Sequence, residues 1–204
     1  MPIAVTAAPY RPVPLDVPHK RWTRAECDAL GAAGLLDLER VELIEGELIA
    51  KMGKKPPHVV TLALVADWMR RVFGEQFVLQ EAPIDVAPED NPANEPEPDV
   101  IVLEHPYVEV RSASPKPSGL RLVIEISATT LGLDLTKKAN LYARAHIAEY
   151  WVFDVAERRL LVHRDPGGGQ YRTITAYNQQ ESVAPLAAPA AAFLVGDAFP
   201  QNTA

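Results

Sequence analysis

Short apolar runs alternate with polar loops along the chain. Two of these runs, 99–103 and 121–126, are apolar at nearly every position. Strands with one solvated face alternate apolar and polar residues, whereas strands covered on both faces read as continuous apolar runs. We therefore expect these two runs to lie inside a sheet that is covered by helices on both sides.

Three segments have the features of helices. Thr23 followed by Glu26 forms a capping-box pattern, which predicts a short helix ending near Ala33. Apolar residues recur at helical spacing over 58–73, and a further helix is expected over 134–145.

Further strands are expected between and after these helices. A hairpin over 41–49 would turn at Gly46. The other expected strands span 77–79, 84–86, 150–153, 160–163 and 171–174. The order of elements predicts an α/β (α+β) fold, with a mixed β-sheet core flanked by α-helices.

The length of 204 residues suits one domain with a sizeable core and loose ends. Prolines are frequent near the start, so we expect a flexible N-terminal arm over 1–20. The folded domain would span 21–178. An Ala/Pro-rich tail over 179–204 would be partly docked through the apolar patch 193–195.

Composition narrows the class of protein. The net charge of −7 argues against a nonspecific coat on nucleic acid, although acids that bind metal would contribute to the same deficit. The single cysteine, Cys27, excludes an internal disulfide, fits the cytoplasm and is interpreted as packing in the first helix. No apolar run is long enough for a membrane span.

Asp99 and Glu125 each lie inside one of the two apolar runs. Buried carboxylates are costly unless they are paired or bound to metal. Strand alternation places Glu125 on the same face as Val123 and Ser127. Because Mg²⁺ prefers oxygen ligands, the pair predicts a divalent metal site, to which the Ile126 carbonyl could contribute. The alternative is two strand-end acids hydrogen-bonded to amides or to a basic side chain.

Asp134, Lys138 and Tyr142 are spaced by four residues and share one face of the expected helix. A lysine aimed at the metal site could hold a water or stabilise charge on a phosphate in the transition state. The alternative is an exposed Asp–Lys pair, worth about 0.3 kcal/mol, with Tyr142 in the core.

Other polar residues have two interpretations each. Glu42 is either a third inward acid or a solvent-facing residue of the hairpin. His58, beside Lys54 and Lys55, either contacts a phosphate backbone or begins a solvated helix. His163 is interpreted as ordinary hairpin surface.

These segments, in this order, resemble the signature of the Uma-two family of restriction endonucleases, within the PD-(D/E)XK nuclease superfamily. The matching segments are 42–49, His58, 98–100, 122–127, the Asp134, Lys138 and Tyr142 set, and 149–154. The resemblance covers about residues 20–175, and it implies that 21–178 is a nuclease-like domain.

The resemblance also implies a restriction-endonuclease-like sheet and a metal-dependent phosphodiesterase site. It places the metal-binding acids at Asp99 and Glu125 and a further acid at Glu42. The lysine of the common superfamily pattern would stand at Ser127, and Lys138 from the next helix is the substitute. The implied catalytic set is therefore Glu42, Asp99, Glu125 and Lys138, and the residues that line the site would be His58, Lys54, Lys55, Ser127, Asp134 and Tyr142.

The leading functional hypothesis is an endonuclease that hydrolyses DNA with Mg²⁺, for which Mn²⁺ could substitute. Cutting both strands of a duplex usually needs two sites, so a homodimer is expected. Its interface could involve Tyr150, Trp151 or Phe193, unless these pack in the core. Two alternatives are a catalytically silent nuclease-fold binding or assembly module and a hydrolase of small phosphorylated substrates.

Overall fold

Residues 18–200, except 52, 54 and 110–112, are described by the computed structural model. Six strands form a mixed sheet in the order β3-β4-β5-β6-β7-β8, in which β5 and β6 are parallel and the other neighbours are antiparallel. These strands are β3 (Val78–Gln80), β4 (Val100–Leu103), β5 (Leu120–Ser127), β6 (Glu149–Asp154), β7 (Arg159–Gly167) and β8 (Gln170–Tyr177). No helix in the described ranges is long and apolar enough to cross a membrane.

Helices and two small hairpins surround this sheet. The helices are α1 (Arg24–Ala32), α2 (Pro56–Phe73), α3 (Leu131–Leu133) and α4 (Ala139–Arg144), with a π-helical turn, Asp134–Lys138, between α3 and α4. The hairpins pair β1 (Val41–Ile44) with β2 (Glu47–Ala50), and β9 (Ser182–Val183) with β10 (Phe193–Leu194).

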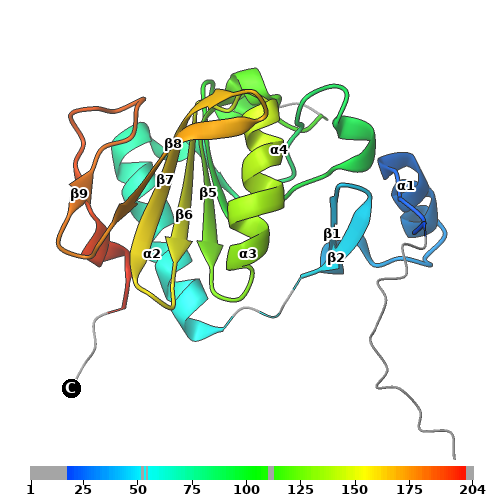
Figure 1. Cartoon of the computed structure of the whole chain (residues 1–204), viewed down its shortest axis with the longest axis horizontal. Coiled ribbons are helices and arrows are strands. Elements are labelled where there is room, and N and C mark those ends of the chain that lie inside the picture. The colour runs from blue at the N-terminus through cyan, green and yellow to red at the C-terminus, as the bar shows by residue number, and fades with distance from the viewer. Residues whose placement is uncertain (1–17, 52, 54, 110–112, 201–204) are drawn as a thin grey trace, which may run out of the picture.

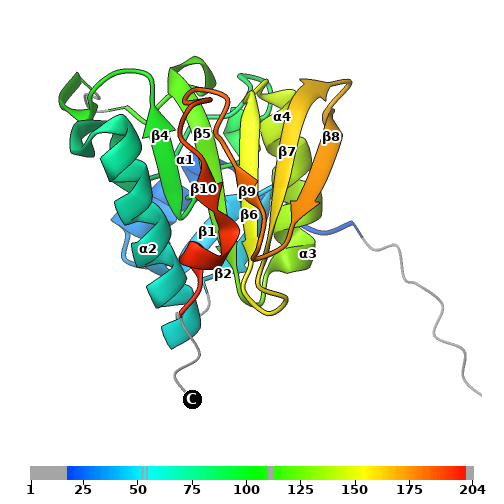
Figure 2. The ribbon, with the colours of Figure 1, turned by 90° about the vertical axis from the view of Figure 1, so that its left-hand side faces the viewer.

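The sheet is covered on both faces (Figures 1 and 2). Val100 and Ile124 face α2 and the β9–β10 segment, whereas Ile101 and Val123 face α4. All four side chains are fully buried. The prediction that 99–103 and 121–126 are strands covered on both sides is confirmed, and so is the predicted mixed sheet flanked by helices.

Local sequence explains where the first elements begin and turn. Thr23 and Glu26 form the expected capping box at the start of α1. The β1–β2 turn passes through Glu45 and Gly46, with φ angles of 50° and 73°. A side chain at position 46 would also lie 2.9 Å from Cβ of Arg21, so glycine is required by both space and backbone.

The helix expected over 134–145 begins earlier and contains the π turn. The Ala139 N–H donates to the carbonyls of Asp134 and Thr136, five and three residues earlier, and not to the usual acceptor four residues back. A π turn adds one residue to the helix and often occurs at functional sites. Here it leaves both Asp134 and Lys138 buried.

The predicted strand over 84–86 is wrong. Ile84 and Val86 are fully buried, which explains their apolar pattern, but they join no sheet. The Ile84 N–H donates to the Pro96 carbonyl and the Asp85 N–H donates to the Pro115 carbonyl. Proline has no N–H to return, so no reciprocal ladder forms at these two contacts.

The interpretation of His163 as surface is also wrong. Its side chain is buried, with ring centroids 5.2 Å from Tyr150 and 5.7 Å from Tyr171. Burial lowers the pKa of the imidazole, so His163 is neutral at physiological pH. The pattern of the hairpin alone could not show this, because Tyr150 comes from β6, outside the hairpin.

The aromatic residues considered for a dimer interface are core residues. Tyr150 and Trp151 are fully buried, and Phe193 packs against Trp151 with centroids 6.3 Å apart. The segment from β9 to Phe199 lies beside α2 on the same face of the sheet and covers the part of that face that α2 does not cover (Figure 2). An interface between copies must use another surface.

Glu149 holds this C-terminal segment onto the sheet. Its buried carboxylate accepts hydrogen bonds from Arg164 at 2.5 Å, from Trp151 Nε1 at 2.9 Å and from the Leu186 N–H at 2.7 Å. Glu149→Ala is expected to lower the free energy of unfolding by about 3 kcal/mol, because Arg164 loses its carboxylate partner in a largely buried setting.

Urea unfolding followed by fluorescence measures this effect. The exposed Glu157 on the β6–β7 turn provides the control, since Glu157→Ala should leave the midpoint nearly unchanged. An equal midpoint for Glu149→Ala and the wild type would refute this structural role.

Candidate active site

A cavity of about 450 Å³ lies where the β1–β2 hairpin meets the ends of β4 and β5 and the π turn. Glu42, Asp99, Glu125 and Lys138 all line it. The four residues come from segments that are far apart in sequence, and the fold brings them into one place. Seven acidic side chains and two lysines line the cavity, so its walls carry an excess of negative charge.

The pairing of β4 with β5 positions the two central acids. Val100 lies opposite Ile124, and the same register continued by one residue places Asp99 opposite Glu125. Directly opposed residues of antiparallel strands project from the same face. The Ile126 N–H donates to Asp99 Oδ2 at 2.7 Å, which fixes the carboxylate at the end of β4.

The Ile126 backbone also bears on the predicted carbonyl ligand. In a strand, the N–H and C=O of one residue point toward the same neighbouring strand. Because the Ile126 N–H points to Asp99, the Ile126 carbonyl lies on the same side of β5. The arrangement is therefore compatible with that prediction.

Lys138 is buried at the centre of the acids. Its Nζ lies 2.8 Å from Glu42 Oε1 and 2.8 Å from Glu125 Oε1. Burial opposes the charged ammonium, but the carboxylates of Glu125, Glu42 and Asp134 outweigh it and raise the pKa of Lys138. The alternative of an exposed Asp–Lys pair is wrong, and Lys138 is a fixed positive charge.

Burial is the largest influence on the pKa values of Glu125 and Asp134, the acids around Lys138. Burial, reinforced by Asp134, Asp99 and Glu42, raises the pKa of Glu125 well above the usual range despite Lys138. Burial likewise raises the pKa of Asp134, although Lys138 and Thr130 partly offset it. One ammonium does not compensate these carboxylates, and an added cation would stabilise their ionised forms.

Tyr142 and Asp134 support the two central charges. The Tyr142 hydroxyl lies 3.2 Å from Glu125 Oε1, and burial beside Glu125 raises the pKa of the phenol well above its usual value. Tyr142 is thus a neutral donor to Glu125. Lys138 and Tyr142 both reach Glu125 and Asp134 lines the same cavity, so the three residues share the face that their spacing predicted.

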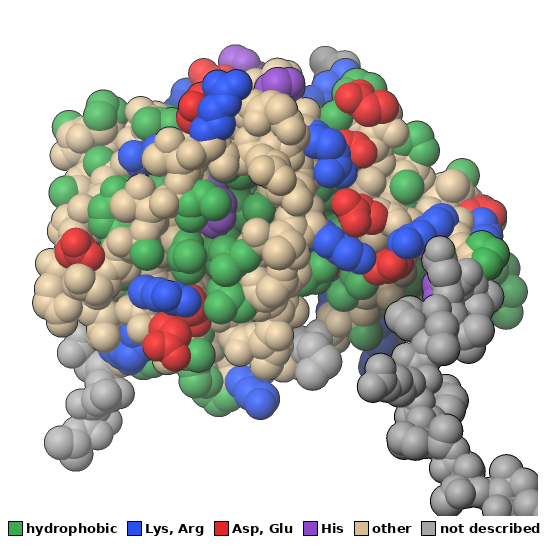
Figure 3. Space-filling model, viewed as in Figure 1, with side chains coloured by type: hydrophobic (Ala, Val, Ile, Leu, Met, Phe, Trp, Pro, Cys, Tyr) green, Lys and Arg blue, Asp and Glu red, His purple; other side chains and the backbone are tan. Residues whose placement is uncertain are grey.

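Glu42 fastens the β1–β2 hairpin to the site. Its Oε1 accepts the Glu97 N–H at 2.7 Å as well as approaching Lys138. On the neighbouring strand, Glu47 pairs with Lys137 at 2.5 Å, and Figure 3 shows acidic and basic side chains gathered over this hairpin. The inward interpretation of Glu42 agrees with its burial, and its solvent-facing alternative does not.

The residues expected at the edge of the site differ in their placement. His58 Nε2 lies 3.2 Å from Asp99 Oδ1, although the ring is not aligned for a hydrogen bond. With Lys55, His58 lines a pocket of about 110 Å³ that also reaches Asp99. Lys54 lies outside the described residues. Ser127 is buried, and its hydroxyl lies 3.5 Å from that of Thr130.

Sequence reasoning missed Thr130 and Tyr150. The Thr130 hydroxyl donates to Asp134 Oδ2 at 2.7 Å, and the Tyr150 hydroxyl donates to the Asp134 carbonyl at 3.1 Å. The threonine at the start of a helical segment was a recognisable signal, because hydroxyl side chains often bond near helix N-termini. Tyr150 gave no such signal, since an aromatic residue in an apolar strand is ordinary core.

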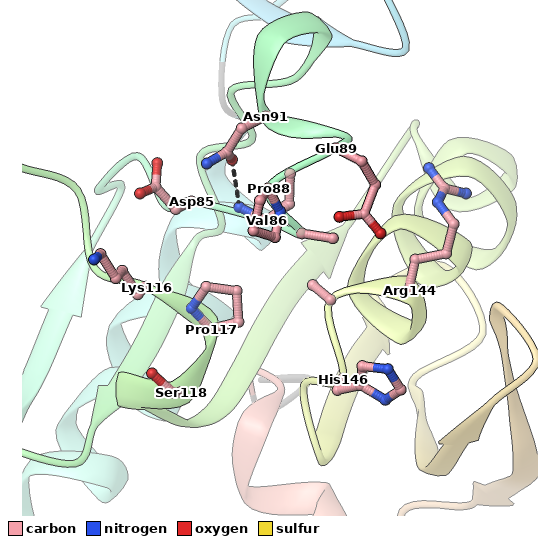
Figure 4. Close-up of a pocket in the computed structure, with 12 residues that line it drawn as sticks. Asp85, Val86, Pro88, Glu89, Asn91, Lys116, Pro117, Ser118, Arg144 and His146 are labelled. Atoms are coloured by element: carbon pink, nitrogen blue, oxygen red, sulfur yellow. Dashed lines mark hydrogen bonds between the residues drawn. The ribbon is translucent and has the colours of Figure 1, made fainter.

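A larger cavity, about 650 Å³, lies elsewhere on the molecule, between the 85–91 loop and the end of α4 (Figure 4). Its acids do not converge. Asp85 pairs with Arg24 at 2.9 Å, and Arg144 in its wall pairs with Asp90 at 2.7 Å. The smaller, acidic cavity is therefore the candidate active site.

Comparisons with known proteins bear on the fold and the family. One solved structure with a similar fold is described as a putative nuclease belonging to DUF820, from Anabaena variabilis. It is 18% identical, has a TM-score of 0.61, and the alignment covers 82% of this chain and 94% of that one. No curated protein matches the chain.

A family model described as "Uma2: Putative restriction endonuclease" matches residues 32–195. The match spans the β1–β2 hairpin, the sheet, the π turn and most of the C-terminal segment, and it includes Glu42, Asp99, Glu125 and Lys138. The whole sheet and these four residues therefore lie within the matched region, and the chain belongs to the Uma2 family.

Proposed function

We propose that the protein is a Mg²⁺-dependent endonuclease that hydrolyses DNA phosphodiester bonds. The observation that carries the proposal is the buried Lys138 held between Glu42 and Glu125, beside Asp99, in an open cavity. Family membership supports a nuclease, and the chemistry of the donor set supports the metal. DNA is the proposed substrate because the family is described as one of restriction endonucleases.

The residues present fit a hard divalent cation. Asp99 and Glu125 offer carboxylate oxygens, and the Ile126 carbonyl lies on the same side of β5 as Asp99. Among the described residues, no group of three His, Cys, Asp or Glu side chains forms a ready metal centre. Mg²⁺ suits such a set, since it is often held by one or two carboxylates and keeps several waters.

The ion would polarise the phosphate and lower the pKa of an attacking water. Lys138 provides a permanent positive charge that could hold this water or stabilise the charge that develops on the phosphate. Glu42 keeps Lys138 in place through its own bond to the Glu97 N–H. Tyr142 donates to Glu125 and orients that carboxylate.

Lys55 is the described lysine best placed to contact DNA. It is exposed at the start of α2 and lines the small pocket that contains His58 and Asp99. A lysine at this point could contact a phosphate beside the scissile bond, without reading sequence. Lys51 is less available, because it pairs with Glu97 at 2.6 Å.

Metal removal tests the proposal directly. We expect supercoiled plasmid to be nicked with Mg²⁺ or Mn²⁺, to remain intact with chelator, and to be nicked again when the metal is restored. The reason is that the carboxylates of the cavity are negative and cannot polarise a phosphate or lower the pKa of a water, which the metal would do.

The same preparation should bind the metal independently of turnover, which isothermal titration measures. Metal binding without nicking of any DNA would favour the silent binding module. Hydrolysis of small phosphate esters, but not of DNA, would favour the small-substrate hydrolase. Nicking that survives complete chelation would contradict the proposed mechanism.

A further inference from the structure

Strand β8 is the outer strand of the sheet, and nothing in the described part of the chain pairs with its free edge. Figure 2 shows it at the margin of the sheet. The side chains from Arg172 to Ala176 are all exposed, and Ile174 is 56% exposed. Exposed edges are templates for pairing, and proteins usually protect them with charges, prolines or bulges. Over 173–176 the strand has neither charge nor proline.

The backbone direction at this edge follows from the ladder. The Val155 N–H donates to the Ser127 carbonyl, so the backbone of Ser127 faces β6. The side toward which the backbone N–H and C=O groups point alternates from residue to residue along each strand. The pairing registers of β5 with β6, β6 with β7 and β7 with β8 therefore determine this side for each residue of β8. The backbone of Thr175 then faces β7, and that of Ile174 faces outward.

The sequence of β8 is nearly symmetric about Ile174. From Tyr171 to Tyr177 it reads Tyr-Arg-Thr-Ile-Thr-Ala-Tyr, which is the same from either end except at Arg172 and Ala176. A strand that pairs antiparallel with its own copy about a twofold axis places each residue opposite its symmetric partner. The symmetry of β8 therefore matches the symmetry of such a pair.

We propose that β8 is the surface through which two copies of this chain associate, antiparallel about Ile174, so that two six-stranded sheets become one. This inference depends on the strand alone and not on the proposed nuclease activity. Two Ile174 residues would exchange both backbone hydrogen bonds, because their N–H and C=O groups face outward.

The side chains suit this register. Thr173 lies opposite Thr175 of the copy, and threonine pairs are among the stabilising cross-strand contacts. Arg172 lies opposite Ala176 and not opposite its own copy, so like charges do not meet. Tyr171 is buried in its own subunit, so the contact between copies would be made mainly by Thr173, Ile174 and Thr175.

The surroundings of the edge also favour a second copy. A hollow of about 280 Å³, lined by Ile174, Ala139 and His163, lies between β8 and α4, where the exposed Ile174 of the copy would be received.

Light scattering of the full chain at micromolar concentration tests the proposal, and we expect a dimer. Ile174→Pro removes an N–H that faces outward, a change that edge strands tolerate. It deletes two interface hydrogen bonds, one per copy, and should raise the dissociation constant by at least about tenfold. Ile174→Lys should have the same effect by placing two like charges together.

Circular dichroism should show that both variants remain folded. Ile174→Cys should form an intersubunit disulfide on oxidation, whereas Val108→Cys, an equally simple change at an exposed site away from β8, should not. A wild-type monomer, or a dimer that persists unchanged in both Ile174→Pro and Ile174→Lys, would overturn the proposal.

Discussion

Asp99→Asn and Glu125→Gln are each expected to reduce metal-dependent plasmid nicking by at least about a hundredfold, since a catalytic cation contributes several kcal/mol to the transition state. Each change replaces an anionic oxygen donor with a neutral amide of nearly the same shape. The two residues lie at opposed strand positions and line the same cavity, so loss of either carboxylate should weaken the binding of the same metal ion.

Both substitutions keep the shape of the side chain, so a loss of nicking can be distinguished from a loss of folding. In Asp99→Asn the amide oxygen can still accept the Ile126 N–H, and in Glu125→Gln it can still accept from Lys138 and Tyr142. Because both amides keep the hydrogen bonds of the carboxylates they replace, both variants should remain folded, which circular dichroism checks.

The control is Asp85→Asn, which makes the same chemical change in the larger cavity, where Asp85 pairs with Arg24. Nicking should remain within a few-fold of the wild type, and metal binding should be unchanged. If both Asp99→Asn and Glu125→Gln cut plasmid as fast as this control, the assignment of the site is wrong.

Strand periodicity was sufficient to predict part of the geometry of this cavity. Alternation separated Glu125 from its apolar neighbours Ile124 and Ile126, and the structure shows that separation across the two faces of β5. Helical spacing placed Lys138 and Tyr142 together, and both reach Glu125. These inferences succeeded because they depend only on the local geometry of one strand or helix.

The remaining features depend on partners outside the strand or helix that carries each residue. The run 84–86 has the composition of a strand, but its backbone meets prolines of two loops and forms no ladder. His163 has the surroundings of a surface hairpin, but Tyr150 and Tyr171 cover it. The π turn lies where Asp134 and Lys138 both face the cavity that contains Glu42 and Glu125, and the sequence of the helix contains no pattern that predicts the turn.

Lys138→Met is expected to lower the free energy of unfolding by about 4 kcal/mol at neutral pH, the usual cost of removing one partner of a buried ion pair. Methionine fills a similar volume without charge. Glu42 and Glu125 would then face each other and Asp134 with no ammonium between them. Urea unfolding measures the loss, and Lys55→Met on the exposed end of α2 is the matched control.

The pH dependence of this loss has a defined sign. Burial already raises the folded-state pKa of Glu125 and Asp134, and Lys138 is the group that lowers both. Without it these pKa values rise further, so the folded variant binds protons that the unfolded chain releases. Its stability should therefore be fully present below an unfolded carboxyl pKa of about 4.3 and fall as the pH rises through the folded-state values.

Combining Lys138→Met with Glu125→Gln separates charge from packing. If the cost of Lys138→Met is the uncompensated carboxylate, the double variant should recover more than half of the lost free energy at neutral pH and should lose most of the pH dependence. If the cost is a packing defect, the two effects should add and the pH dependence should remain. Because the readout is stability and not activity, the experiment tests this ion pair independently of whether the protein cleaves DNA.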